Sequence, residues 1–109
     1  MTKMANFKSI AEKTAREGVT RRVFSGENSM MVLNTIQAFA QPALHQHPHE
    51  QITYILQGEC DFTMGDEVIK MKAGDVVLVP PDMPHTLRPT SDETIINFDV
   101  FSPIREDYL

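Results

Sequence analysis

Residues 45–51 read His-Gln-His-Pro-His-Glu-Gln and lead directly into the strand-like run 52–57. This heptapeptide contains all but one of the histidines of the chain. Because every second side chain of a strand lies on the same face, His45 and His47 are expected to point the same way, about 6 to 7 Å apart. Imidazole nitrogens bind Zn, Cu, Fe and Ni, and a carboxylate or amide oxygen can complete such a site. The stretch therefore predicts a metal site beside a strand.

The remaining histidine, His85, follows a Pro-Pro-Asp-Met-Pro run, and together the two segments resemble the cupin superfamily. The first cupin motif reads HxH, three or four residues, Glu, six residues, Gly; the second reads Gly, five residues, Pro and then His. The matching positions in order are His45, His47, Gln51 and Gly58, then Gly74, Pro80 and His85. The resemblance implies a divalent transition metal ion (Ni, Zn, Fe or Mn) on His45, His47, Gln51 and His85.

Two positions depart from the general cupin pattern, and two more leave the ligand set open. Gln51 stands where Glu is usual, and Pro89 stands where an Asn often follows the second-motif His. Counting back from Gly58 selects Gln51 as a ligand, whereas a one-residue bulge would select Glu50. Strict alternation would place His49 on the ligand face, but a bulge favoured by the preceding proline places it at the rim. A neutral Gln ligand leaves the ion its full charge, which favours polarisation of an anionic ligand.

The rest of the chain consists of short strand-like runs separated by turn signals, with almost no helical periodicity. This pattern predicts an all-β sandwich or barrel, and the cupin resemblance implies a double-stranded β-helix, or jelly roll. Residues 21–109 are expected to form this barrel as a single domain. Residues 1–20 are expected to form an N-terminal arm or a short helix, with Ser9 as the N-cap and Gly18 at the C-terminal end.

Composition narrows the class of protein. A chain of 109 residues makes one domain, and its net charge of -5 argues against a nucleic-acid-binding protein. The single Cys60 cannot form an internal disulfide. No apolar run approaches the length of a membrane span, and the N-terminus lacks an apolar signal core. We therefore expect a cytoplasmic protein with no membrane partner.

The last strand-like run, residues 94–101, has one polar and one apolar face. Asn97 and Asp99 lie on one face with Phe101, and the other face is apolar throughout. If the polar face looks into the barrel, the apolar face is outside and needs a cover. A second copy of the chain would supply it, so we expect a homodimer.

The C-terminal run Phe-Ser-Pro-Ile-Arg-Glu-Asp-Tyr-Leu, residues 101–109, extends the resemblance. With the residues 18–21, the His-Pro-His-Glu-Gln block and the Val-Pro-Pro block, it is similar to the uronate-linearising (KdgF-like) cupins of pectin degradation. Those enzymes convert 4,5-unsaturated monouronates into linear keto-uronates. The resemblance implies an anionic sugar substrate, with Asp99 moving protons, Arg105 holding a carboxylate and Phe101 forming an apolar wall.

Two other functions fit the same residues. A non-enzymatic cupin would bind a sugar or another small molecule and keep the metal as part of its structure. A metal-dependent dioxygenase would use a related His-rich site for redox chemistry, although Gln51 does not suit the carboxylate-containing iron triad of such enzymes.

Overall fold

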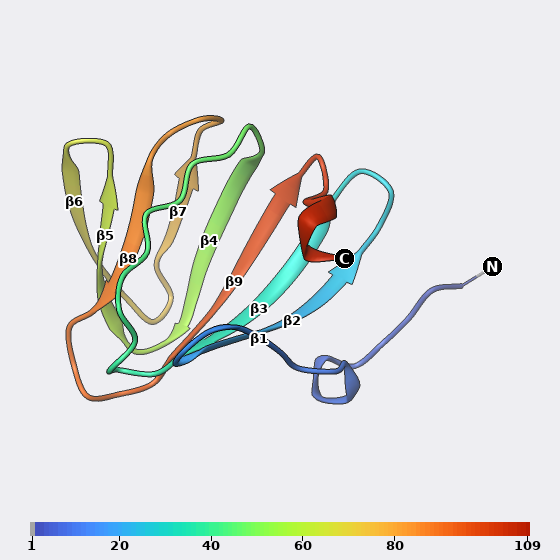
Figure 1. The fold of residues 1–109 in the computed structure, drawn as a ribbon, viewed down its shortest axis with the longest axis horizontal. Coiled ribbons are helices and arrows are strands. Elements are labelled where there is room, and N and C mark those ends of the chain that lie inside the picture. Colours follow the sequence, from blue (N-terminus) through green and yellow to red (C-terminus); the bar gives the residue numbers. More distant parts are fainter. Residues whose placement is uncertain (1) are drawn as a thin grey trace.

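The regular secondary structure of the chain is almost entirely β-strand. The computed structural model describes residues 2–109, so residue 1 of the expected N-terminal arm lies outside the described residues. Figure 1 shows the strands as two layers that face each other. The strands are β1 (Lys13–Arg16), β2 (Val19–Ser25), β3 (Met30–Ile36), β4 (Glu50–Gln57), β5 (Glu59–Met64), β6 (Glu67–Lys72), β7 (Val76–Val79), β8 (His85–Pro89) and β9 (Ile95–Ser102). Two short 3-10 helices, η1 (Phe7–Ser9) and η2 (Glu106–Tyr108), lie near the ends of the chain.

The strands form two antiparallel sheets. The larger sheet has the order β1-β2-β3-β9-β4-β7, and the smaller one has the order β6-β5-β8. The core lies between them and consists of inward side chains from both sheets, including Ile55 and Ile95 from the larger sheet and Phe62 from the smaller. Cys60 is part of this core. This arrangement confirms the predicted all-β jelly roll.

Of the two alternatives expected for residues 1–20, an arm or a short helix, the helix between Ser9 and Gly18 does not form. Residues 13–16 instead form β1, which pairs with β2 through a turn at Gly18, where the backbone has a φ of 80° that favours glycine. The segment has little apolar surface with which to pack a helix, whereas pairing with β2 satisfies its backbone hydrogen-bonding groups. The barrel therefore begins before the expected boundary at residue 21, which lies inside β2.

Arg22 fixes the arm that precedes β1. Its Nη1 donates to the carbonyl oxygens of Phe7, Lys8 and Ile10 at 2.9 to 3.1 Å, and its Nη2 lies 3.5 Å from a carboxylate oxygen of Glu12. The arm also packs on the sheet, since the Phe7 ring lies edge-on to Phe98 with 5.1 Å between the ring centroids. The N-terminal arm thus covers part of the outer face of the larger sheet.

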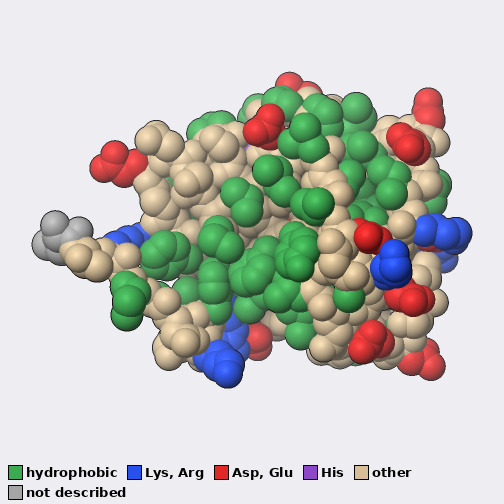
Figure 2. Space-filling view, turned by 180° about the vertical axis from the view of Figure 1, so that it is seen from behind, with side chains coloured by type: hydrophobic (Ala, Val, Ile, Leu, Met, Phe, Trp, Pro, Cys, Tyr) green, Lys and Arg blue, Asp and Glu red, His purple; other side chains and the backbone are tan. Residues whose placement is uncertain are grey.

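The rest of that outer face is apolar and exposed. Strand register places Leu78, Ile52, Val100 and Met31 in one row across β7, β4, β9 and β3, and Figure 2 shows a broad hydrophobic patch on this side of the molecule. The exposed members of the face are Met31, Ile52, Tyr54, Leu56, Val76 and Leu78. A contiguous apolar surface of this kind is typical of an interaction site.

The homodimer stays a prediction, and this face is where we expect its interface. Light scattering at micromolar concentration should give about twice the mass of one chain. The double variant Ile52→Lys with Leu78→Glu should return the monomer mass, because buried charges at the centre of an apolar interface are costly. Val68→Lys, on an exposed position of β6 in the other sheet, is the control. A monomeric wild-type protein would contradict the prediction.

Among residues 2–109, no helix has the length and apolar character needed to cross a membrane.

Candidate active site

The histidine segment runs beside the start of β8 and then enters β4. His45 and His85 form an isolated antiparallel bridge, with N–H donations in both directions at 2.8 and 2.9 Å. This bridge brings together two residues that are forty positions apart in the sequence. At the start of β4 the side chains alternate, so Gln51 is buried while Glu50 is exposed on the other face. Of the two alternatives left open by the sequence, only Gln51 faces the interior.

Three imidazoles gather at this point. The ring centroid of His85 lies 5.8 Å from that of His45 and 5.0 Å from that of His47. His47 and His85 are buried, and His45 is half-buried. Burial and the neighbouring His85 lower the pKa of His45 to about 4, and burial and Arg105 lower the pKa of His47. Both rings are therefore neutral near pH 7, which is the form that binds metal.

The hydrogen bonds of two rings fix which nitrogen is free. The Nδ1 of His47 lies 3.1 Å from the carbonyl oxygen of His49, and the Nδ1 of His85 lies 2.9 Å from that of Met83. A carbonyl oxygen only accepts, so each Nδ1 carries the hydrogen and each Nε2 keeps its lone pair. Backbone partners of this kind orient metal-binding histidines in many proteins.

One pair of side chains has the spacing of adjacent metal ligands. The Nε2 of neutral His47 lies 2.9 Å from Oε1 of Gln51, so two lone-pair donors face each other. Adjacent ligands about 2.1 Å from one ion at a right angle are about 3 Å apart, which matches this spacing. Counting only His, Cys, Asp and Glu, no three side chains of residues 2–109 are positioned to hold an ion as they lie. The three imidazoles are therefore not arranged around one ion as they lie, and a metal at this point stays a prediction.

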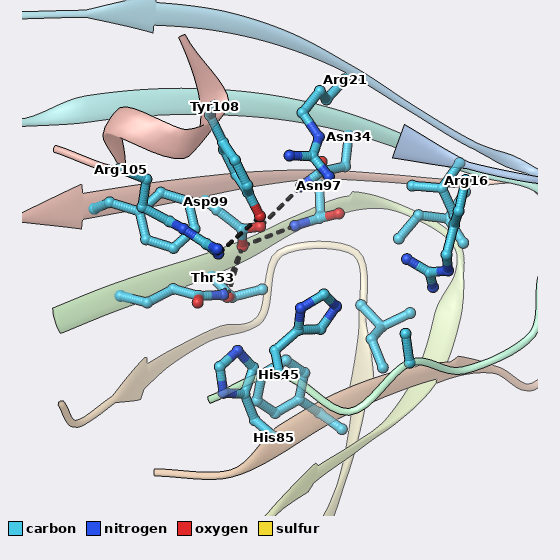
Figure 3. A pocket seen from close by; sticks show the side chains of 17 residues that line it. Arg16, Arg21, Asn34, His45, Thr53, His85, Asn97, Asp99, Arg105 and Tyr108 are labelled. Atoms are coloured by element: carbon cyan, nitrogen blue, oxygen red, sulfur yellow. Dashed lines mark hydrogen bonds between the residues drawn. The ribbon is translucent and has the colours of Figure 1, made fainter. Parts of the chain in front are cut away.

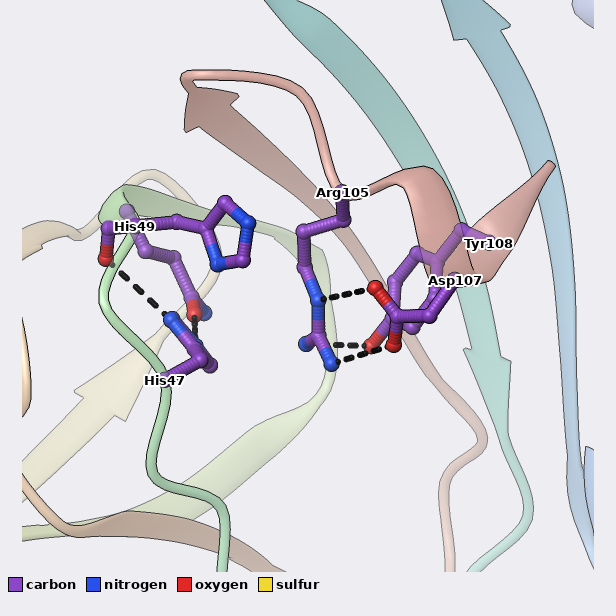
Figure 4. A network of polar contacts seen from close by, with 6 residues as sticks. His47, His49, Arg105, Asp107 and Tyr108 are labelled. Carbon is purple, nitrogen blue, oxygen red and sulfur yellow. Dashed lines mark hydrogen bonds and ion pairs between the residues drawn. The ribbon is translucent and has the colours of Figure 1, made fainter.

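The fourth histidine of the chain, His49, sits next to this group. Its carbonyl oxygen accepts from His47, and its ring lies 5.4 Å from the His47 ring and 6.4 Å from Phe101 between centroids. Figure 4 shows His47 and His49 on one side of Arg105. The ring of His49 therefore lies beside the histidine group, and its rim position stays a prediction.

Asp99 lies in the same cavity and is half-buried. Its Oδ1 accepts from Thr53 at 2.8 Å and from the amides of Gln51 and Asn97 at 3.1 Å, and its Oδ2 accepts from Asn34 at 2.8 Å. Burial raises the pKa of Asp99 above its ordinary value, and the hydrogen bonds from Thr53, Asn34 and Gln51 oppose this rise. A carboxyl group with a raised pKa can both hold and release a proton.

The C-terminal tail turns back over the cavity. Phe101 is buried at the end of β9, with its ring 5.5 Å from that of His47 and 5.7 Å from that of Tyr108. Arg105 has a nearly buried side chain that donates to Tyr108 Oη at 2.8 Å and to Asp107 Oδ2 at 2.9 Å (Figure 4). Arg105 is therefore a cavity residue rather than part of a solvated tail.

The cavity between the two sheets also contains residues that the sequence did not indicate. Its volume is about 70 Å³, and it is lined by His45, Gln51, His85, Asp99, Phe101 and Arg105. The additional polar lining residues are Arg16, Arg21, Asn34, Thr53 and Tyr108, and they lie beside Asn97, which the alternation of the last strand had placed on the inward face (Figure 3). Thr53 follows Gln51 by two residues on the same strand face, which is a signal that sequence reasoning could have used.

A family model described as the cupin domain matches residues 32–101, which is more than half of the chain. The chain belongs to the cupin family. The matched range covers both motifs and the strands that carry Gln51, His85 and Asp99.

Among curated relatives, this cupin is 37% identical over 57 residues to the H2HPP isomerase of Bacillus subtilis. That match covers 51% of the chain and 24% of the relative. This cupin is also 29% identical over 73 residues to the uncharacterized protein MJ1618 of Methanocaldococcus jannaschii, and that match covers 66% of the chain and 58% of the relative. The chain therefore spans less than two thirds of the length of either protein.

Solved structures resemble this cupin over its whole length. An RmlC-like cupin from Shewanella frigidimarina has a TM-score of 0.90 at 24% identity, covering 100% of this chain and 97% of the other. KdgF from Halomonas sp. has a TM-score of 0.89 at 23% identity, covering 100% of both chains. Identities this low establish the shared fold and nothing further.

Proposed function

We propose that this cupin is a metal-dependent enzyme that converts 4,5-unsaturated monouronates to linear keto-uronates. The observation that carries the proposal is a cavity lined by His45, Gln51, His85 and Asp99, with His47 in contact with Gln51 and His85. The resemblance of the chain to uronate-linearising cupins names the substrate class. The similarity to an isomerase also suits the reaction, because ring opening to a ketone is an isomerisation.

The reaction needs two proton transfers, and it neither consumes nor releases a net proton. Breaking the bond between C1 and the ring oxygen, with transfer of the C1 hydroxyl proton to that oxygen, leaves an aldehyde at C1 and an enol at C5. Moving the enol proton away and placing a proton on C4 gives the ketone at C5. No oxidant, reductant or co-reactant is needed. A group that accepts one proton and gives one, held near C4 and the ring oxygen, is sufficient.

In the proposed reaction, Asp99 is the group that supplies the proton at C4. Its four hydrogen-bond donors hold the carboxyl group in one orientation. Phe101 forms an apolar wall beside the sugar, and Arg105 binds the carboxylate with its guanidinium edge. His45, His47, Gln51 and His85 would hold the divalent ion, which would supply Lewis-acid polarisation of the ring oxygen and carboxylate.

The test is a spectrophotometric assay. Unsaturated monouronate made by a polyuronate lyase is incubated with the purified protein, and the loss of C4=C5 absorbance is compared with the spontaneous rate. We expect acceleration that a chelator abolishes and an added divalent metal restores. A metal-loaded sample that binds the sugar without accelerating its loss would instead select a non-enzymatic binding cupin, and oxygen consumption by an iron-loaded sample would select a dioxygenase.

Arg105→Met should raise KM for the unsaturated uronate by about tenfold while changing kcat less, because a charge-assisted contact with a carboxylate is worth roughly 1.5–3 kcal/mol. Steady-state kinetics across a range of substrate concentrations checks this. Arg88→Met is the matched control, since Arg88 is exposed on the smaller sheet and pairs only with Asp61. An unchanged KM in Arg105→Met would show that the carboxylate binds elsewhere.

A further inference from the structure

Arg16 and Arg21 lie on one wall of the cavity, apart from Arg105. Arg16 comes from the end of β1 and Arg21 from β2, and both line the cavity together with His45 and Asp99. Figure 3 shows the two arginines on one side of Asp99 and Arg105 on the other. Neither residue was among the expected site residues, and Arg16 lies in the segment expected to form an N-terminal arm or a short helix.

The two guanidinium groups have unused donors. Arg16 Nη2 donates to the carbonyl oxygen of Gln41 at 3.0 Å, and Arg21 stacks on Tyr108 with its Cζ 3.8 Å from the ring centroid. The Nε atoms of both arginines are buried and have no hydrogen-bond partner among residues 2–109. Stacking uses the face of a guanidinium and leaves its N–H edge available for an anion.

The adjacent Arg22 shows what a structural arginine looks like in this fold. It points to the other side of β2, where its contacts with three carbonyl oxygens and Glu12 are described above. Within the described chain, by contrast, no carboxylate forms an ion pair with Arg16 or Arg21. Packing therefore accounts for Arg22 but leaves the charges of the other two uncompensated.

The cavity lining is positively charged although the protein as a whole is negatively charged. The protein has a net charge of -5, yet the cavity lining contains three arginines and one carboxylate, Asp99. Burial and the charge of Arg21 lower the pKa of Arg16, as expected for two cations placed close together. Asp107 already pairs with Arg105. A single carboxylate bound by Arg105 would leave the Arg16–Arg21 wall without a counter-charge.

We propose that Arg16 and Arg21 form a second anion subsite, so that the ligand of this cavity carries two anionic oxygen groups. One group lies toward the histidine cluster and Arg105, and the other accepts hydrogen bonds from Arg16 and Arg21. The second group is a carboxylate, or a sulfate or phosphate ester. The inference rests on the proposed use of the cavity for an acidic sugar, and it narrows the substrate to an unsaturated uronate that bears a second anionic substituent.

The test is isothermal titration of the metal-loaded, full-length protein with a matched pair of sugar acids. D-galactonate and galactarate have the same carbon skeleton, and galactarate carries a second carboxylate at the other end. We expect galactarate to bind about tenfold more tightly than galactonate, the size of one additional charge-assisted contact. D-galactonate 6-phosphate is the second arm. Whichever of the two, galactarate or this phosphate ester, binds more tightly identifies the anion that the subsite prefers.

Variants then locate the subsite. Arg21→Met should remove the preference for galactarate and leave the Kd of galactonate unchanged, while Arg88→Met should leave both Kd values unchanged. Arg16→Met repeats the test without disturbing Tyr108, in case Arg21→Met fails to fold. Arg21→Lys should restore part of the preference, because it keeps the charge.

Failure of the subsite and failure of the proposed reaction are distinguishable. Equal Kd values for galactonate, galactarate and the phosphate ester in the wild-type protein would overturn the subsite, whatever the turnover. So would a preference that persists in both Arg16→Met and Arg21→Met. If the protein binds galactarate or the phosphate ester more tightly than galactonate but does not accelerate the loss of C4=C5 absorbance, the proposed reaction is wrong. The subsite would then still hold.

Discussion

Asp99→Asn should lower kcat for the unsaturated uronate by a factor of about 10² to 10⁴, the usual contribution of a positioned acid or base. An amide keeps the size of the carboxyl group but cannot donate the proton that C4 requires. Binding should change less than turnover, because the sugar carboxylate is expected to contact the arginines and the histidine cluster. Steady-state kinetics of metal-loaded protein measures both quantities.

This substitution also disturbs the hydrogen bonds around Asp99, so the comparison needs a structural control. Asn34, Thr53, Gln51 and Asn97 all donate to the carboxylate, and an amide cannot accept from all of them on both of its atoms. Circular dichroism and metal content must therefore match the wild type before the rates are compared. Asp92→Asn, in an exposed loop, should leave the activity unchanged. Near wild-type turnover in a folded Asp99→Asn would contradict the role of Asp99.

His85→Ala should reduce bound metal from about one ion per chain to near zero and bring the rate down to the spontaneous one. His85 is buried, its Nδ1–H is bound to the Met83 carbonyl, and its ring lies between those of its two partner histidines and Phe62. Loss of this donor leaves two imidazoles and an amide, too few for tight binding of a divalent ion. Elemental analysis after dialysis against a weak chelator gives the stoichiometry.

Two neighbouring residues provide a matched comparison for the fourth ligand. Gln51 faces the histidines and Glu50 faces outward, although they are adjacent in the sequence. Gln51→Ala should weaken metal binding, while Glu50→Ala should leave the stoichiometry at the wild-type value. Metal that survives Gln51→Ala and is lost in Glu50→Ala would show that Glu50 is the ligand.

The sequence was most informative where a pattern is local. Alternation in residues 59–64 and 95–102 predicts strands with one buried face, and β5 and β9 form there. Spacing of the two histidine motifs identified four residues. The fold brings His45, Gln51 and His85 into the cavity lining and places His47 beside His85. The alternation of Asn97, Asp99 and Phe101 likewise predicted the inward face of β9.

The residues that were missed depend on pairing between distant strands. Arg16 reaches the cavity only because residues 13–16 pair with β2, and a segment with so little apolar content gives no local sign of that pairing. Arg21 lies opposite Asn34 in the β2–β3 register, which determines its inward face. The adjacent Arg22 has the same residue type and faces the other way. Residue type alone could not show that Arg21 faces the cavity and Arg22 faces outward.

The most direct test of the central claim is to run the reaction in D₂O and determine the deuterium at C4 of the linear keto-uronate by NMR. If Asp99 delivers the proton from one side of the bound sugar, the product should carry deuterium in a single stereochemical position at C4. The spontaneous reaction supplies the reference, with deuterium in both positions. Deuterium in both positions in the presence of metal-loaded protein, at the spontaneous rate, would contradict the account.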